Sequence, residues 1–131
     1  MSDYIDIDVS DAEPLSTIDD NSERELTITK AVSKEEYDAI LLTLSSAEDP
    51  LAADISHFLN LSHTDGTLKQ KQACAFRLKT FLETFDIPTS GGFSIEDMIG
   101  KTGTVIIGVK ESDDYGKQNT IKRCVNPVDK D

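Results

Sequence analysis

The chain has 131 residues, 37% of them hydrophobic, and a formal net charge of −12. This length fits one ordinary domain that buries its core without disulfide or metal support. No stretch approaches the roughly 20 consecutive apolar residues of a membrane span. The acidic N-terminus has neither the basic start nor the apolar run of a signal peptide. We therefore expect a cytoplasmic protein with no membrane partner.

The charge is unevenly distributed along the chain. Residues 1–23 carry eight acidic residues and no lysine or arginine, whereas residues 101–128 hold five bases and three acids. Charge asymmetry of this kind often accompanies nucleic-acid binding or its regulation. We expect an acidic N-terminal segment at residues 1–23 and a folded domain at residues 24–128.

Residues that favour strands gather in five segments. The first three strands are predicted at residues 25–32, 37–45 and 55–61, and the last two at residues 102–111 and 119–125. Turns containing Pro50 and Gly116 separate the second strand from the third and the fourth from the fifth.

A helix is predicted at residues 68–85. Thr67 and Gln70 have the spacing of a capping box, and Pro88 follows the end of the helix. Five residues at helical spacing form one apolar stripe: Cys74, Leu78, Phe81, Leu82 and Phe85. A short helical turn, bracketed by Ser94 and Asp97 and closed by Gly100, comes before the fourth strand.

The resulting order is three strands, one helix and two strands. It predicts a mainly β chain with one central helix and no parallel crossover. This is the element order of an OB-fold, a five-stranded Greek-key barrel whose helix lies between the third and fourth strands.

Three pieces of the sequence carry a family resemblance. They are Phe76-Arg77-Leu78-Lys79 with Phe81-Leu82, Ile99-Gly100-Lys101, and Tyr115-Gly116-Lys117 followed by Asn119, Lys122 and Arg123. Over roughly residues 20–127 the chain resembles phage-encoded OB-fold proteins, largely uncharacterised, that are proposed to bind single-stranded DNA in replication and recombination. The resemblance implies sequence-non-specific binding in the host cell cytoplasm, with other replication or recombination proteins as further partners.

Single-strand binding needs cations along a groove and flat side chains on which bases stack. An OB-fold presents them on the second and third strands and on the loops that join strands one–two and four–five. The candidate DNA-binding residues at these places are Lys30, Lys34, Tyr37, Phe58, Lys110, Tyr115, Lys117, Lys122 and Arg123. Two alternatives stay open. The basic residues are only the solvent-exposed side chains of a hairpin, or Phe58 belongs to the core.

Lys122 and Arg123 are neighbours, so a regular strand sends their side chains to opposite faces. Only one of them then reaches the groove. Ile121 and Cys124 are apolar residues three positions apart, which indicates a β-bulge at this point of the last strand.

No motif indicates catalysis, a metal or a cofactor. Gly100-Lys101-Thr102 lacks the first glycine of a P-loop, because Ile95 stands there. No nucleophile elbow and no recognisable acid–base pair is present. Cys74 and Cys124 lack metal-ligand spacing to either histidine, so we expect two thiols in a reducing compartment rather than a disulfide or metal site.

An acidic protein–protein interaction module, or a mimic of nucleic acid, is the alternative function. The acidic segment itself has three candidate roles. It competes with DNA phosphates for the basic groove, or it is a disordered solubilising tail. In the third, the alternation of Ile5, Ile7 and Val9 makes residues 4–9 an edge strand. This strand docks on the sheet of its own molecule or of a neighbouring one, and docking on a neighbouring molecule would give a homodimer.

Overall fold

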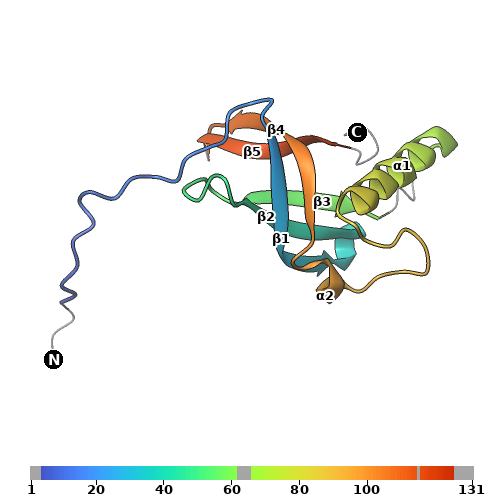
Figure 1. The fold of residues 1–131 in the computed structure, drawn as a ribbon, viewed down its shortest axis with the longest axis horizontal. Helices are drawn as coiled ribbons and strands as arrows, with labels where there is room; N and C mark the ends of the chain where they lie inside the picture. Colours follow the sequence, from blue (N-terminus) through green and yellow to red (C-terminus); the bar gives the residue numbers. More distant parts are fainter. Residues whose placement is uncertain (1–3, 62–65, 115, 126–131) are drawn as a thin grey trace.

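The computed structural model describes residues 4–61, 66–114 and 116–125 (Figure 1). The described chain is mainly β, with five strands in one open antiparallel sheet and one main helix, as the element order predicted. The strands are β1 (Glu23–Lys34), β2 (Ala39–Ser46), β3 (Ile55–Asn60), β4 (Thr102–Ser112) and β5 (Gly116–Cys124). Their order in the sheet is β3-β2-β1-β4-β5.

The predicted strands all form, with shifts at their ends. Tyr37 was expected to begin the second strand, but it lies in the 3-10 turn η1 (Glu35–Tyr37). Asp38 follows with a left-handed φ of 49°, and this reversal lets β2 begin only at Ala39. β5 begins earlier than predicted because the β4–β5 hairpin is tight, with Ser112 opposite Gly116.

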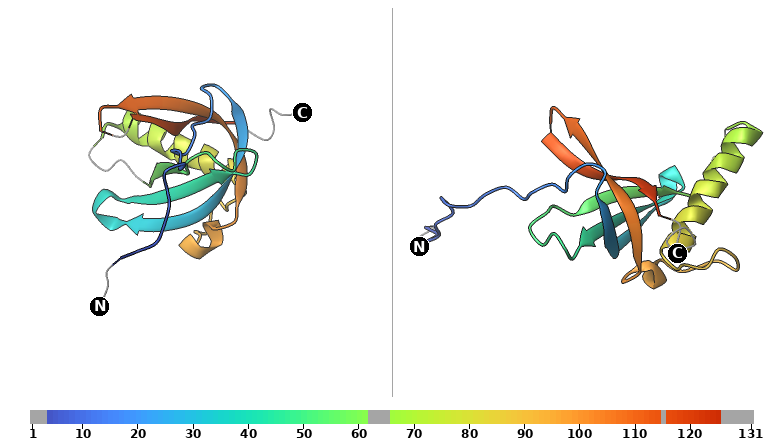
Figure 2. Two further views of the ribbon diagram at one scale, coloured as in Figure 1. Left: turned by 90° about the vertical axis from the view of Figure 1, so that its left-hand side faces the viewer. Right: turned by 45° about the horizontal axis from the view of Figure 1, so that its top comes forward.

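The sheet curls into a barrel-like shape (Figure 2). β1 pairs with β2 over most of its length and with β4 over Glu23–Thr27, and a bulge between Ile28 and Lys30 bends it. The two edge strands, β3 and β5, approach each other across the open side. They are not hydrogen-bonded neighbours within the described residues, so we call the space between them the seam.

Helix α1 (Leu68–Thr84) covers one end of the curled sheet (Figure 1). The predicted capping box is confirmed: Gln70 donates its N–H to Thr67 Oγ1 at 3.2 Å, and Thr67 donates its N–H to Gln70 Oε1 at 2.8 Å. The predicted apolar stripe faces the core, with Phe81 and Leu82 buried and the C-cap residue Phe85 fully buried.

The core lies inside the curled sheet, between the inward side chains of the strands, α1 and the short helix α2 (Ile95–Met98). Its largest fully buried side chains are Leu26, Ile28, Leu42, Leu44, Ile55, Phe85, Met98, Val105 and Ile107. Gly103 lets β4 pass the end of α1, since a Cβ there would lie 2.9 Å from the Phe85 ring and from the Thr84 carbonyl oxygen. Ser94 caps α2 by accepting a hydrogen bond from the Asp97 N–H, as predicted.

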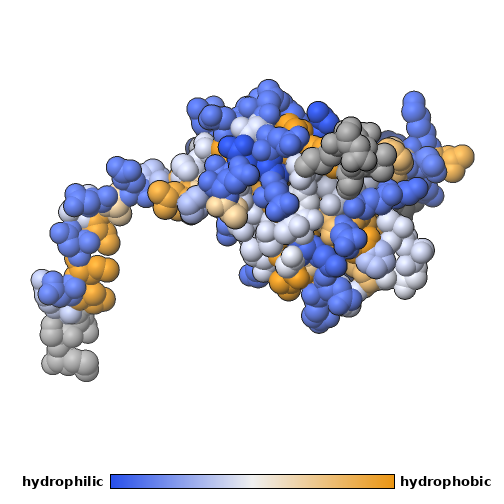
Figure 3. Space-filling view, in the orientation of Figure 1, coloured by the Kyte–Doolittle hydropathy of each residue, from blue (hydrophilic) through white to orange (hydrophobic). Residues whose placement is uncertain are grey.

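The candidate edge strand at residues 4–9 does not pair with any strand among the described residues. These residues extend away from the sheet (Figure 1), and Ile5, Ile7 and Val9 are exposed. A strand is held by backbone hydrogen bonds to a neighbour, and the segment has none beside it here. Hydrophobic side chains are therefore displayed along this segment (Figure 3).

The second part of the acidic segment is packed on the domain. Ser16 forms a parallel bridge with Ala52, and Ile18 is only 4% exposed. The Asn119 side chain accepts a hydrogen bond from the Ile18 N–H at 2.7 Å and donates one to the Ile18 carbonyl at 2.8 Å. The Ile107 N–H donates to the Ser22 carbonyl at 2.7 Å. Residues 16–22 of the acidic segment therefore contact the folded domain.

Two truncations are expected to differ in stability for this reason. Deleting residues 1–15 should leave the free energy of unfolding within the about ±0.5 kcal/mol typical of surface changes. Deleting residues 1–23 also removes Ile18 and should lower it by at least about 2 kcal/mol, the lower end for losing a buried aliphatic side chain. Urea melts of both truncations, with Ile18→Ala in the full chain as control, measure the difference. Equal stability of the two truncations would contradict the packing of Ile18.

Candidate nucleic-acid interface

The outward residues of β1, β2 and β3 form one continuous surface. The registers pair Val32 with Leu41 and Leu41 with Phe58, so these three side chains form an apolar row across the sheet. Alternate residues of a strand share a face, which places Lys30 and Lys34 on either side of this row. We call the surface of Lys30, Val32, Lys34, Leu41 and Phe58, with Tyr37 beside it, the three-strand face.

Two exposed aromatic rings lie together on this face. Tyr37 is 67% exposed and Phe58 is 50% exposed, and their rings meet edge to face with centroids 6.3 Å apart at 80°. The sequence left open whether Phe58 belongs to the core, and the structure places it on the outer face of β3. Both rings therefore keep surface to offer a ligand.

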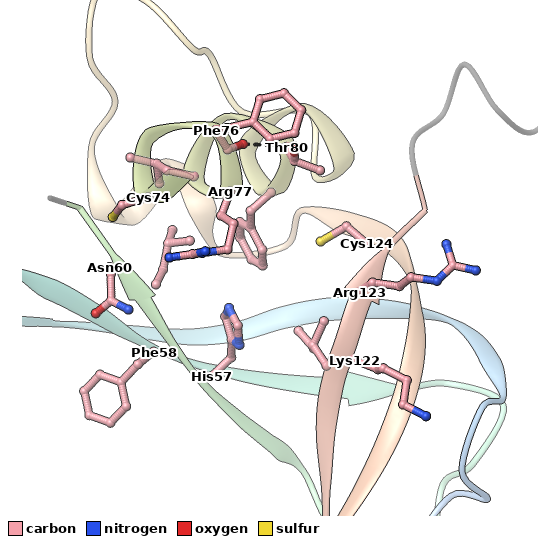
Figure 4. A pocket seen from close by; sticks show the side chains of 14 residues that line it. His57, Phe58, Asn60, Cys74, Phe76, Arg77, Thr80, Lys122, Arg123 and Cys124 are labelled. Carbon is pink, nitrogen blue, oxygen red and sulfur yellow. Dashed lines mark hydrogen bonds between the residues drawn. The ribbon is translucent and has the colours of Figure 1, made fainter. Parts of the chain in front are cut away.

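A groove of about 410 Å³ lies at the seam, between β3, α1 and β5 (Figure 4). We call it the seam groove. Its lining includes His57, Phe58 and Asn60 from β3, Cys74, Arg77 and Phe81 from α1, and Ile121, Lys122, Arg123 and Cys124 from β5. The lining residues include three cations and no acid, although the whole chain has a net charge of −12. Phe58 is among the lining residues, but its ring points away from the groove in Figure 4, so the groove and the three-strand face lie on opposite sides of the edge strand β3.

The predicted bulge in the last strand is confirmed. Ile106 pairs with Arg123 and Ile107 pairs with Ile121, which leaves Lys122 as the extra residue. The bulge breaks the strict alternation of faces. Lys122 and Arg123 are consequently both exposed, and they border the seam groove with their side chains directed outward from β5 (Figure 4).

The acidic segment already contacts one of these cations. Lys122 Nζ donates to Asn21 Oδ1 at 2.6 Å and lies 3.4 Å from Asp20 Oδ1. No ion pair to Arg123 is present among the described residues. Arg123 is therefore the more available of the two bases for an anionic ligand.

Helix α1 adds basic residues that were not among the candidates from the sequence. It carries Lys69, Lys71, Arg77 and Lys79 with one acid, Glu83, while β5 carries three bases and no acid. Together the two elements hold seven of the chain's 13 lysines and arginines and one of its 25 acids. A count of charged residues along the predicted helix would have shown this excess of basic residues.

The hairpin residues among the candidates lie apart from the seam groove. Lys110 and Lys117 are exposed near the β4–β5 turn, where Lys117 pairs with Glu111. At about 3.3 Å per strand residue, Lys117 is roughly 20 Å from Arg123. Figure 1 shows the hairpin at the end of the sheet opposite α1. Tyr115 lies outside the described residues.

His57 forms the outer end of a stack of aromatic rings. Its ring lies parallel to that of Phe81, with centroids 5.4 Å apart at 11°, and Phe81 stacks on Phe85 at 4.4 Å and 20°. Burial lowers the pKa of His57, because the half-buried site disfavours the charged imidazolium. No local sequence pattern marks this stack, because it joins His57 of β3 to two residues of the α1 segment.

Both cysteines are free thiols, and both line the seam groove. Burial raises the pKa of the Cys124 thiol, and its hydrogen bond with Thr84 partly opposes this shift. The thiol is therefore protonated at neutral pH and is a poor nucleophile. Residues 4–61, 66–114 and 116–125 contain no group of three or more His, Cys, Asp or Glu placed to hold a metal ion.

None of the helices in the described part of the chain is long and apolar enough to cross a membrane. The sequence matches no protein-family model, and a search of curated proteins found no match.

Proposed function

We propose that this chain is an OB-type, sequence-non-specific single-stranded-DNA-binding protein that acts in phage replication or recombination. The sheet order β3-β2-β1-β4-β5, with the main helix between β3 and β4, is the order expected of an OB barrel opened at its β3–β5 seam. This topology supports the fold part of the proposal.

The function is carried by the aromatic three-strand face and the cationic seam groove, which adjoin at the edge strand β3. Tyr37 and Phe58 supply flat surfaces on which unpaired bases stack, at about 1–3 kcal/mol per base. Lys30 and Lys34 lie on the same face, on either side of the row that ends at Phe58. His57, the neighbour of Phe58 on β3, lines the groove together with Arg77. Stacking and phosphate neutralisation are thereby combined on one path, as single-strand binding requires.

The first test compares the binding of single-stranded and double-stranded DNA. A dT oligonucleotide should bind more tightly than a duplex of equal length, because the exposed rings need bases that are free of a partner strand. Its affinity should fall with salt, at a slope of about −0.7 for each phosphate that is neutralised. Fluorescence anisotropy from low to moderate salt measures both. A preference for duplex, or binding that does not depend on salt, would contradict the proposal.

The alternative function, an acidic protein-interaction module, has one specific observation in its favour. Ile5, Ile7 and Val9 are exposed on an extended acidic segment, which suits addition to the sheet edge of a partner. Under this alternative the chain shows no affinity for dT at low salt, while a truncation that lacks residues 1–15 loses binding to the partner protein.

A further inference from the structure

The stack of three rings is open at only one end. Phe85 is fully buried and Phe81 is buried, whereas His57 is half-buried and lines the seam groove. In Figure 4 the His57 ring rises from β3 into the space between β3, α1 and β5. A flat ring that enters the groove can extend the stack by one member, with two aromatic rings already fixed beneath His57.

The groove around this ring is suited to an anionic ligand. Arg77 reaches down from α1 into the same space in Figure 4, whereas the side chains of Lys122 and Arg123, which border the groove on β5, extend away from it. No acidic side chain lines the groove. A volume of about 410 Å³ lies within the range of about 300–1,000 Å³ that small-ligand pockets occupy. The groove therefore matches a ligand that combines one flat ring system with negative charge.

His57 is suited to stacking because it is uncharged at neutral pH. Burial lowers its pKa, and the charged groups that line the groove with it, Arg77 from α1 and Lys122 and Arg123 from β5, are all cations. The ring is then a neutral, flat, partly exposed surface in the space that the Arg77 guanidinium also enters.

We propose that the seam groove receives one nucleotide of a bound single strand, with its base stacked on His57 and its phosphate beside Arg77. The inference rests on the proposed function, and it adds a defined pocket to the open stacking surface of Tyr37 and Phe58. One position of the strand is thereby held in a different environment from its neighbours.

The test uses the full-length protein and dT oligonucleotides in which a single 2-aminopurine is moved from position to position. In the wild-type complex one position should be quenched more strongly than the others, because its base is stacked in the groove. H57A should abolish this difference and weaken binding at least about fivefold, the lower end for one stacked base. H57F retains a flat ring on Phe81 and should keep both the quenching pattern and the affinity.

The controls separate this pocket from the proposed function. Ser56→Ala changes an exposed residue on the same strand and should bind as the wild type does. H57A with wild-type affinity and quenching, or H57F as weak as H57A, would overturn the pocket while the oligonucleotide still bound to the three-strand face. The groove would then belong to another occupant, such as the acidic N-terminal segment. Absence of any dT binding by the wild type at low salt would overturn both proposals.

Discussion

Replacing both Tyr37 and Phe58 with alanine is expected to weaken dT binding by about 1–3 kcal/mol for each base that stacks on these rings. The fold should persist, because both rings are largely exposed and contact each other edge to face outside the core. Fluorescence anisotropy measures the affinity, and thermal melting checks the fold.

Two further variants show whether stacking is the cause. A Tyr37→Leu, Phe58→Leu variant keeps apolar surface but removes the flat rings, so it should bind nearly as weakly as the alanine variant. Leu51→Ala removes an exposed apolar side chain outside the three-strand face and should leave the affinity unchanged. If the leucine variant bound as the wild type does, general hydrophobic contact rather than base stacking would explain the role of this face.

Phe85→Ala is expected to lower the free energy of unfolding by about 3–5 kcal/mol, the usual cost of truncating a buried phenylalanine. Phe85 is fully buried and stacks on Phe81 at 4.4 Å, and Gly103 is placed so that β4 passes against its ring. The packed wall of β4 limits how far the site can collapse, so the substitution leaves a cavity. Urea denaturation monitored by circular dichroism measures the loss.

Phe76 provides a matched control on the same helix. It is 65% exposed, so Phe76→Ala should change stability by no more than about 0.5 kcal/mol. Similar losses in the two variants would mean that α1 is not seated through Phe85 as described. Where Phe85→Ala remains folded, the ring stack beneath His57 is loosened, and the enhanced quenching at one 2-aminopurine position should diminish.

Local patterns in the amino-acid sequence were sufficient for the elements themselves. The Thr67–Gln70 capping box involves residues three positions apart, and the stripe that includes Phe81 and Phe85 repeats with the helical period. The spacing of Ile121 and Cys124 likewise revealed the bulge that exposes both Lys122 and Arg123. Each of these features depends on residues that lie close together in the chain, so a short window of sequence contains the necessary information.

Tertiary structure alone decided which residues share a surface. Phe58 lies beside Leu41 and Val32 only through the registers of two strand pairs. Lys122 is held by Asn21, 101 positions away, and Asn119 binds Ile18 at the same separation. His57 becomes the open end of a ring stack only because α1 sets Phe81 against it. Registers and packing between distant segments are set by the burial of the whole core, and no local period records them.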